Sequence, residues 1–248
     1  MSDLILETHG LTRDFLGFRA VSEVDLRVRR GTIHALIGPN GAGKTTVFNL
    51  LARFLAVSAG RIIYEGNDIT DARPSIVARN GLVRSFQISA IFPHLTVREN
   101  IRLGLQSRTR DAYNFWRPDS RLAVLDDRVQ ELAEAVGFER DMLELTAVEL
   151  PYGRRRALEI ATTLALEPRL LLLDEPMSGL GREDIQRISK LIRRVAADRT
   201  VLMVEHNLSV VAELSDMITV MARGKLLVEG PYEKIAQHPA VIEAYMGR

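Results

Sequence analysis

The fold is decided by one stretch of sequence, Gly38-Pro39-Asn40-Gly41-Ala42-Gly43-Lys44-Thr45-Thr46. It matches the pattern G-x-x-x-x-G-K-[ST] at every fixed position, with an apolar segment before it and an amphipathic segment after it. Glycines let backbone N–H groups converge on an anion, and the start of the following helix adds further N–H donors. We therefore predict a phosphate-binding loop, in which Lys44 reaches the β- and γ-phosphates of a nucleoside triphosphate and the Thr45 hydroxyl ligates Mg²⁺.

Short apolar runs around this loop predict the strands of a sheet. Residues 32–37 lead directly into the loop, and residues 170–173 and 201–204 are four-residue apolar runs. Such runs are too short for helices and are typical of parallel strands that are covered on both faces. From residue 158 onward these runs alternate with helical patterns, which indicates an α/β layer with a parallel sheet.

Other segments predict two further parts of the fold. Residues 24–28 alternate apolar and polar side chains, and residues 61–68 have the pattern of a strand that runs into a turn. After the loop, apolar residues recur with helical spacing through residue 55. Residues 88–149 are expected to be mostly helical, with one apolar stripe formed by Leu122, Leu125, Val129, Leu132, Ala133 and Val136.

We therefore predict one α/β domain over residues 1–248, built as a P-loop NTPase core with a parallel sheet, an N-terminal antiparallel β subdomain and an inserted helical subdomain. The nucleotide-binding core and its β subdomain would comprise approximately residues 1–87 and 158–248. The helical subdomain would comprise approximately residues 88–157.

Composition excludes several classes of protein. Lys and Arg number 33 and Asp and Glu number 32, so the net charge of +1 argues against binding nucleic acid through bulk charge. The 46% of hydrophobic residues indicates a globular chain, and the absence of cysteine excludes disulfides and thiolate metal sites. No apolar run reaches the ~18 residues of a spanning helix, and the acidic N-terminal stretch predicts no signal peptide.

Two acids, Asp174 and Glu175, follow the apolar run at 170–173. Ligands of open α/β sheets bind at the carboxyl ends of the strands. At such a place Asp174 can hold Mg²⁺, and Glu175 can orient and deprotonate a water that attacks the γ-phosphate. His206 follows the next apolar run in the same way and can donate a hydrogen bond to a γ-phosphate oxygen.

The order of these motifs resembles that of the ATP-binding subunits of ABC transporters over essentially the whole chain. After the phosphate loop come Gln87, which matches the family's Q-loop, a stretch that matches its signature motif, then Asp174 and Glu175, and finally His206. The signature motif is usually Leu-Ser-Gly-Gly-Gln, and here it reads Leu150, Pro151, Tyr152, Gly153 and Arg154.

The resemblance implies further site residues and partners. Phe15 would stack on adenine and, with Val21, belong to the nucleotide site, while Gln87 would contact the metal. Two chains would associate head to tail around two ATP, with each signature motif capping the partner's nucleotide. The resemblance also implies permease subunits in the membrane, a solute-binding protein and a place on the cytoplasmic face of the inner (plasma) membrane, with no nucleic acid partner.

Within the family, the chain is similar to the LivG-type ATPases of branched-chain amino acid importers. The similarity rests on Leu-Pro-Tyr-Gly at 150–153, on V-R-S-F-Q at 83–87, on V-E-H-N at 204–207 and on the segment 238–247. Urea importers and the lipopolysaccharide exporter ATPase are alternatives for the substrate. DNA-repair-type ABC ATPases carry long arms that segment 88–149 is too short to form, and a small-molecule kinase would have no signature motif.

Two departures from the family pattern concern the second ATP contact. Pro151 stands where the signature motif usually has serine, so it offers no hydroxyl to a γ-phosphate. Gly181 ends the D-loop, residues 178–181, without the usual carboxylate or amide.

Three surface features have two interpretations each. The arginines at 154–156 follow Gly153 at a helix start, where cations are disfavoured, so they would face either an anion of the partner or solvent. Phe92, Leu95, Thr96 and Val97 would form either a groove for a membrane-domain helix or ordinary subdomain core. The aromatic patch of Tyr113, Phe115 and Trp116 would face the membrane domain or the bilayer, or pack locally.

Overall fold

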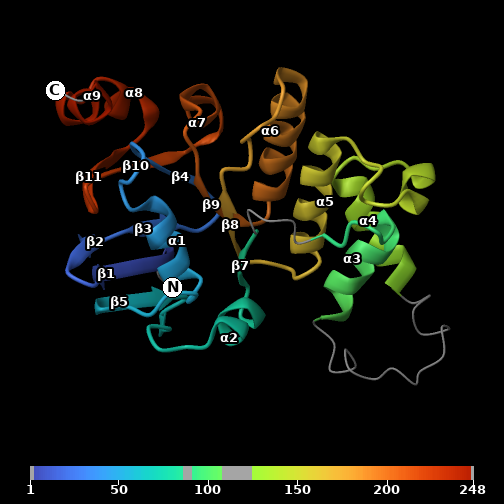
Figure 1. Cartoon of the computed structure of the whole chain (residues 1–248), viewed down its shortest axis with the longest axis horizontal. Coiled ribbons are helices and arrows are strands. Elements are labelled where there is room, and N and C mark those ends of the chain that lie inside the picture. Colours follow the sequence, from blue (N-terminus) through green and yellow to red (C-terminus); the bar gives the residue numbers. More distant parts are fainter. Residues whose placement is uncertain (1–2, 86–90, 108–124, 247–248) are drawn as a thin grey trace. The chain divides into compact units, whose positions relative to one another are not determined.

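The structure is a computed structural model, shown in Figure 1, and it describes residues 3–85, 91–107 and 125–246. Gln87 and the aromatic patch at 113–116 therefore lie outside the described residues. The chain divides into two compact units. The first contains Met1–Arg84, Arg169–Met177 and Arg193–Arg248, and the second contains Ser85–Pro168 and Ser178–Ile192. The predicted subdomain boundaries near residues 88 and 157 stay a prediction.

The first unit begins with an antiparallel sheet, as the alternating N-terminal pattern predicts. The long strand β1 pairs with β2, β3 and β5, and β6 extends the sheet beyond β5. These strands are β1 (Leu4–Phe15), β2 (Phe18–Val24), β3 (Arg27–Arg29), β5 (Ala59–Tyr64) and β6 (Asn67–Asp68).

Within the described residues, the other strands form a second sheet with the order β11-β10-β4-β9-β8-β7. All neighbours from β10 to β7 are parallel, and β11 is antiparallel to β10. Every residue of β4, β8 and β9 is buried, which confirms the parallel strands predicted from the apolar runs. The strands are β4 (Ile33–Ile37), β7 (Leu82–Arg84), β8 (Leu170–Asp174), β9 (Thr200–Val204), β10 (Met217–Ala222) and β11 (Lys225–Gly230).

Helix α1 (Lys44–Leu51) packs against both sheets through one buried cluster. The cluster joins Phe48 of the helix to Ile62 of β5 and Leu202 of β9. The helical spacing predicted through residue 55 is wrong beyond Leu51. Arg53 has a φ of 63°, which an α-helix cannot continue through, and Leu55 packs on the core from the loop that follows.

The remaining helices of the first unit are short. They are α2 (Pro74–Arg79), α7 (Leu208–Leu214), α8 (Tyr232–Ala236) and α9 (Pro239–Met246). Among the residues that the structure describes, no helix is both long enough and apolar enough to span a lipid bilayer.

The second unit is helical, as predicted for the insertion. Its elements are α3 (Val97–Gln106), α4 (Asp126–Ala135), the 3-10 helix η3 (Arg140–Glu144), α5 (Tyr152–Leu164) and the first part of α6 (Arg182–Ala196). Leu122 of the predicted apolar stripe lies outside the described residues, and Leu125 is half-buried. The rest of the stripe is buried: Val129, Leu132, Ala133 and Val136.

The proposed groove residues at 92–97 separate into two kinds. Val97 is fully buried, and Thr96 caps α3 by accepting a hydrogen bond from the Glu99 N–H. The Glu99 carboxylate in turn accepts from the Thr96 N–H at 2.7 Å, which completes a capping box. Phe92, in contrast, is 57% exposed, so the core interpretation holds for Val97 and fails for Phe92.

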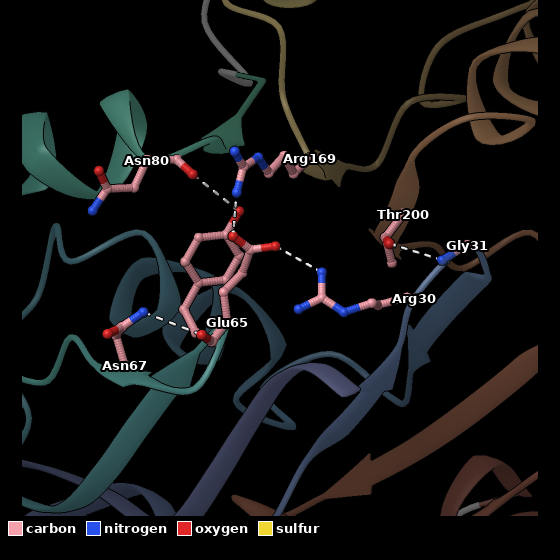
Figure 2. Close-up of polar contacts among 8 residues, drawn as sticks. Arg30, Gly31, Glu65, Asn67, Asn80, Arg169 and Thr200 are labelled. Atoms are coloured by element: carbon pink, nitrogen blue, oxygen red, sulfur yellow. Dashed lines mark hydrogen bonds and ion pairs between the residues drawn. The ribbon is translucent and has the colours of Figure 1, made fainter. Parts of the chain in front are cut away.

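An ion-pair cluster closes the amino-end edge of the parallel sheet (Figure 2). Glu65, in the turn after β5, accepts from Arg30 at 2.6 Å and from Arg169 at 2.5 Å. Arg30 lies just before β4, and Arg169 lies just before β8. Thr200, the first residue of β9, accepts from the Gly31 N–H at 3.0 Å. The starts of three parallel strands are therefore tied to each other or to the antiparallel sheet.

Candidate functional site

The predicted site segments leave the parallel sheet at one edge. β4, β9 and β8 are neighbours, and their register sets Leu36 opposite Val204 and Val204 opposite Asp174. The phosphate loop starts just after β4, Glu175 follows β8, and His206 lies two residues beyond Val204. Because the strands are parallel and in step, all three segments emerge at the carboxyl-end edge, as the sequence predicts.

The backbone of the phosphate loop requires glycine at two close approaches. A Cβ at Gly38, whose φ is 151°, would lie 2.1 Å from the carbonyl oxygen of Met221. A Cβ at Gly43, whose φ is 99°, would lie 2.7 Å from the carbonyl oxygen of Ala20. The loop therefore lies in close contact with the backbone of Met221 and Ala20, while Gly41 at its tip has open space around it.

Helix α1 starts without a cap of its own. Gly43 occupies the N-cap position and provides no side-chain hydrogen bond, and the first turn contains no acid. The helix start therefore keeps its N–H groups and its partial positive charge for a ligand. The other loop residues surround this start: Asn40 and Thr45 are exposed, Pro39 and Thr46 are half-buried, and Ala42 is buried.

Lys44 lies inside the loop, where its side chain is nearly fully buried. Its ammonium donates to the carbonyl oxygens of Gly38 at 2.7 Å and Pro39 at 3.0 Å. Burial lowers the pKa of Lys44, and the charges of Glu175 and Asp174 oppose that change. The structure thus brings the predicted lysine within electrostatic range of both predicted acids.

Asp174 and Glu175 differ in their surroundings although they are adjacent. Asp174 ends β8, is 1% exposed and forms an ion pair with Arg84 of β7 at 2.5 Å. Glu175 is half-buried, and its N–H donates to the Val204 carbonyl at 2.9 Å. Its φ of 47° is left-handed, a costly backbone for a residue with a side chain and one that clusters at functional sites.

A positioning residue that the sequence reasoning missed is Glu205. Its carboxylate is fully buried and accepts from the backbone N–H of Met177 at 2.9 Å and of His206 at 3.0 Å. It also accepts weakly from the Asn207 N–H at 3.3 Å. One carboxylate therefore fixes the loops after β8 and β9, and the His206 side chain is exposed beside it. An acid directly after a fully buried run was the available signal.

The residues assigned to the adenine end lie in the antiparallel sheet. Phe15 ends β1, is 38% exposed, and has the Arg13 guanidinium 4.6 Å from its ring centroid. Val21 is fully buried in β2, so its side chain offers no surface to a ligand. Its neighbour Ala20 lies close to Gly43 of the phosphate loop, so Val21 belongs to the strand that supports this loop.

The signature motif opens α5 in the second unit. Leu150 is buried, and Pro151 is the N-cap, without a side-chain hydrogen bond and with no acid in the first turn. A Cβ at Gly153 would lie 2.2 Å from the Asp184 carboxylate carbon, so a larger residue here would displace the Asp184 side chain of α6. Tyr152 is 55% exposed.

The signature motif and the predicted D-loop touch within one chain. The Tyr152 hydroxyl donates to the Ser178 carbonyl at 3.3 Å. Its ring lies against Gly179, whose φ is 75°. Gly181 has open space where a side chain would be.

Each of the three arginines after Gly153 has a partner in its own unit. Arg154 donates to the Gly137 carbonyl at 2.5 Å and lies over the Phe138 ring. Arg155 donates to the Leu150 carbonyl at 2.8 Å, and Arg156 pairs with Glu159 at 2.5 Å. These contacts account for the arginine run, so it no longer indicates an anion from a partner.

The residues present fit a triphosphate with an oxygen-ligated divalent metal. The uncapped helix start, the glycine backbone and the buried ammonium suit an anion. The Thr45 hydroxyl and the Asp174 carboxylate are oxygen donors, and Mg²⁺ takes one or two carboxylates together with phosphate oxygens.

Comparison with known proteins decides the family. The sequence model described as ABC transporter matches residues 21–178. BraF of Pseudomonas aeruginosa, a high-affinity branched-chain amino acid transport ATP-binding protein, is 37% identical over all of this chain and 99% of the relative. This chain belongs to the ABC transporter ATP-binding family. As a member of this family it is a nucleotide-binding ATPase, which confirms the resemblance inferred from its motifs.

Further matches place this ABC ATPase within its family. A model described as branched-chain amino acid ATP-binding cassette transporter matches residues 225–248. The LivG proteins of Salmonella typhimurium and Escherichia coli K12 are 36% and 35% identical, each over 100% of this chain and 99% of the relative. The chain is therefore an ATP-binding protein of the branched-chain amino acid group.

Solved structures agree with this fold. A nucleotide-free ATP-binding cassette from an ABC transporter has a TM-score of 0.87 and 27% identity, covering 99% of this chain and 100% of that one. The ADP conformation of an ABC transporter cassette has a TM-score of 0.85 and 26% identity, covering 100% of both chains.

Proposed function

We propose that this ABC ATPase powers the uptake of branched-chain amino acids. The observation that carries the proposal is the combination of the C-terminal match with full-length relatives whose names specify high-affinity branched-chain amino acid transport. Urea import and lipopolysaccharide export are not favoured, because the matching group is named for branched-chain amino acids.

At the proposed nucleotide site the chain would bind ATP through backbone and side chain together. The N–H groups of the loop 38–46 and of the α1 start would surround the phosphates, and Lys44 would turn from two carbonyls to the β- and γ-phosphates. Phe15 would stack on adenine with its face opposite Arg13. The support is that the loop and the α1 start follow β4 at the carboxyl-end edge of the parallel sheet, and that Phe15 is partly exposed at the end of β1.

Mg²⁺ would be held by the Thr45 hydroxyl, by Asp174 and by Gln87. When bound, the metal supplies positive charge to the phosphate oxygens. The burial of Asp174 at the end of β8 supports its part in this set.

For hydrolysis, Glu175 would orient the attacking water and accept its proton, and His206 would donate a hydrogen bond to a γ-phosphate oxygen. The strained backbone at Glu175 and the fixed loop before His206 support these roles. Lys44 would stabilise the charge that develops on the phosphate.

Two such subunits would close around two ATP molecules. Residues 150–154 of one chain would cap the nucleotide of the other, because the α5 start has neither a side-chain cap nor an acid in its first turn. Pro151 provides no hydroxyl, so backbone N–H groups would carry this contact. ATP would bind the closed dimer better than the open one, and hydrolysis would reopen it.

The ATPase would work on the cytoplasmic face of the inner membrane, attached through permease subunits and served by a solute-binding protein. The support is the family itself, whose members are transporter components. Phe92, exposed ahead of α3, is our candidate for a permease contact.

The test combines one variant with a matched control. Glu175→Gln should retain ATP affinity within about threefold while hydrolysis falls about a hundredfold or more, because proton acceptance is lost. Glu233→Gln, an exposed acid of α8, should change neither. Cells that carry Glu175→Gln in place of the native chain should lose uptake of labelled leucine but keep uptake of urea.

Normal hydrolysis in Glu175→Gln would remove Glu175 from its role. Unchanged leucine uptake together with a loss of urea uptake would show that the chain serves urea import instead.

A further inference from the structure

Arg84 joins the phosphate-loop helix to the acid that ends β8. Its guanidinium donates to the Asp174 carboxylate at 2.5 Å and to the Asn49 side-chain oxygen of α1 at 2.5 Å. The guanidinium carbon also lies 6.0 Å from the Phe48 ring centroid. All four residues belong to the first unit. Arg84 thus bridges α1 and β8, the two elements that form the proposed metal site.

Burial makes this ion pair more than a surface contact. The Asp174 side chain is 0% exposed and the Arg84 side chain is 9% exposed. A carboxylate in such a place is strongly unfavourable unless a cation or several hydrogen bonds compensate its charge. Without a metal, the Arg84 guanidinium provides a cation in direct contact with Asp174.

We propose that Arg84 is a positioning residue that compensates the Asp174 charge when Mg²⁺ is absent, so that Arg84 and Mg²⁺ compete for that charge. The inference rests on the proposed metal site at Thr45 and Asp174. Two cations that draw on one buried carboxylate oppose each other, and linkage makes the opposition reciprocal. Arg84 therefore weakens Mg²⁺ binding, and bound Mg²⁺ weakens the hold of Arg84 on Asp174.

The arrangement has a use in a turnover cycle. When Mg²⁺ and product are gone, Asp174 would remain as a buried acid. The Arg84 guanidinium would compensate its charge, because it already donates to both Asn49 and Asp174 without rearrangement. Arg84 would thereby keep the end of β8 assembled in the nucleotide-free protein.

The experiment measures affinity rather than turnover. The full chain and Arg84→Gln are titrated with a fluorescent ADP analogue, once with Mg²⁺ and once with EDTA. The dissociation constant with EDTA, divided by that with Mg²⁺, is the metal contribution to binding. In Arg84→Gln this metal contribution should rise about tenfold, and the melting temperature of the nucleotide-free protein should fall by about 5 °C or more.

Arg30→Gln is the matched control. Arg30 pairs with Glu65 at the opposite edge of the parallel sheet (Figure 2), so its loss should lower the melting temperature without changing the metal contribution. Asn49→Ala provides a second variant that keeps all charges. Because this variant removes one hydrogen-bond partner of Arg84, it should raise the metal contribution a few-fold. It tests the proposal if Arg84→Gln does not fold.

A metal contribution that is unchanged or smaller in the variants would overturn the proposal and reduce Arg84 to a structural ion pair. If the native chain binds the ADP analogue equally well with Mg²⁺ and with EDTA, the proposed metal site itself fails. If the native chain does not bind the analogue at all, the proposed nucleotide function fails.

Discussion

The amino-end edge of the parallel sheet and the phosphate loop at its carboxyl-end edge differ in how their charges are compensated. At the amino-end edge, Glu65 is held between Arg30 and Arg169, and the charges cancel within the chain (Figure 2). At the carboxyl-end edge, the phosphate loop has an uncapped helix start, and the ammonium of Lys44 donates to two carbonyl oxygens of the loop. The first arrangement stabilises the fold, and the second is suited to an anionic ligand. Substitutions at the two edges should therefore separate stability from binding.

The largest expected effect is a loss of binding at the carboxyl-end edge. Lys44→Ala removes a buried ammonium aimed at the phosphates, so ATP affinity should fall about a hundredfold. Titration with a fluorescent ATP analogue measures it. Stability should change little, because the loss of two hydrogen bonds is offset by relief of the desolvation cost of a buried ammonium. Affinity within threefold of the native value would mean that the ammonium is not part of the site.

The sequence could predict this edge because its signals are local. Glycine spacing, the lysine and the apolar runs at 170–173 and 201–204 each act within a few residues, and parallel register then brings their ends together. Arg84 could not be assigned from sequence, because its partners come from another strand and from helix α1. Glu205 had a local signal, but its bond to the Met177 N–H comes from a loop that is distant in sequence. Of the arginines at 154–156, Arg154 was hidden for the same reason, since it donates to the Gly137 carbonyl, whereas Arg155 and Arg156 have local partners.

An intermediate effect is expected at Glu205, the part of the carboxyl-end edge that is satisfied internally. Glu205→Gln places an amide N–H₂ group against backbone N–H donors, so unfolding free energy should fall by about 2 kcal/mol. Thermal unfolding measures it. Glu213→Gln is the control, because the exposed Glu213 pairs with Arg193 only at 3.8 Å and should cost less than about 0.5 kcal/mol. Equal losses of unfolding free energy in the two variants would contradict a stabilising role for the buried Glu205 carboxylate.

The smallest effect, and the one that depends on pH, concerns Glu65. The hydrogen bond from Arg30, followed by that from Arg169, holds the pKa of Glu65 below its usual value despite the opposing effect of burial. Glu65 therefore stabilises the fold above the unfolded pKa of about 4.3, and this contribution is lost as the pH falls toward the lowered folded pKa.

Glu65→Gln should lower unfolding free energy at pH 7 by on the order of 0.5–1 kcal/mol, and the gap to the native chain should narrow below about pH 4. Urea unfolding at both pH values measures it, and nucleotide affinity should stay unchanged. A gap that persists at low pH would show that shape, and not charge, matters at this position.

The left-handed backbone at Glu175 has a consequence for engineering. Most residues other than glycine and asparagine pay on the order of 1 kcal/mol of backbone strain at a φ of 47°, which those two adopt more readily. Selection for heat resistance alone would therefore enrich those two residues at this place and delete the general base proposed above. Directed evolution of this chain needs an activity screen beside every thermal one, because at position 175 the two goals diverge.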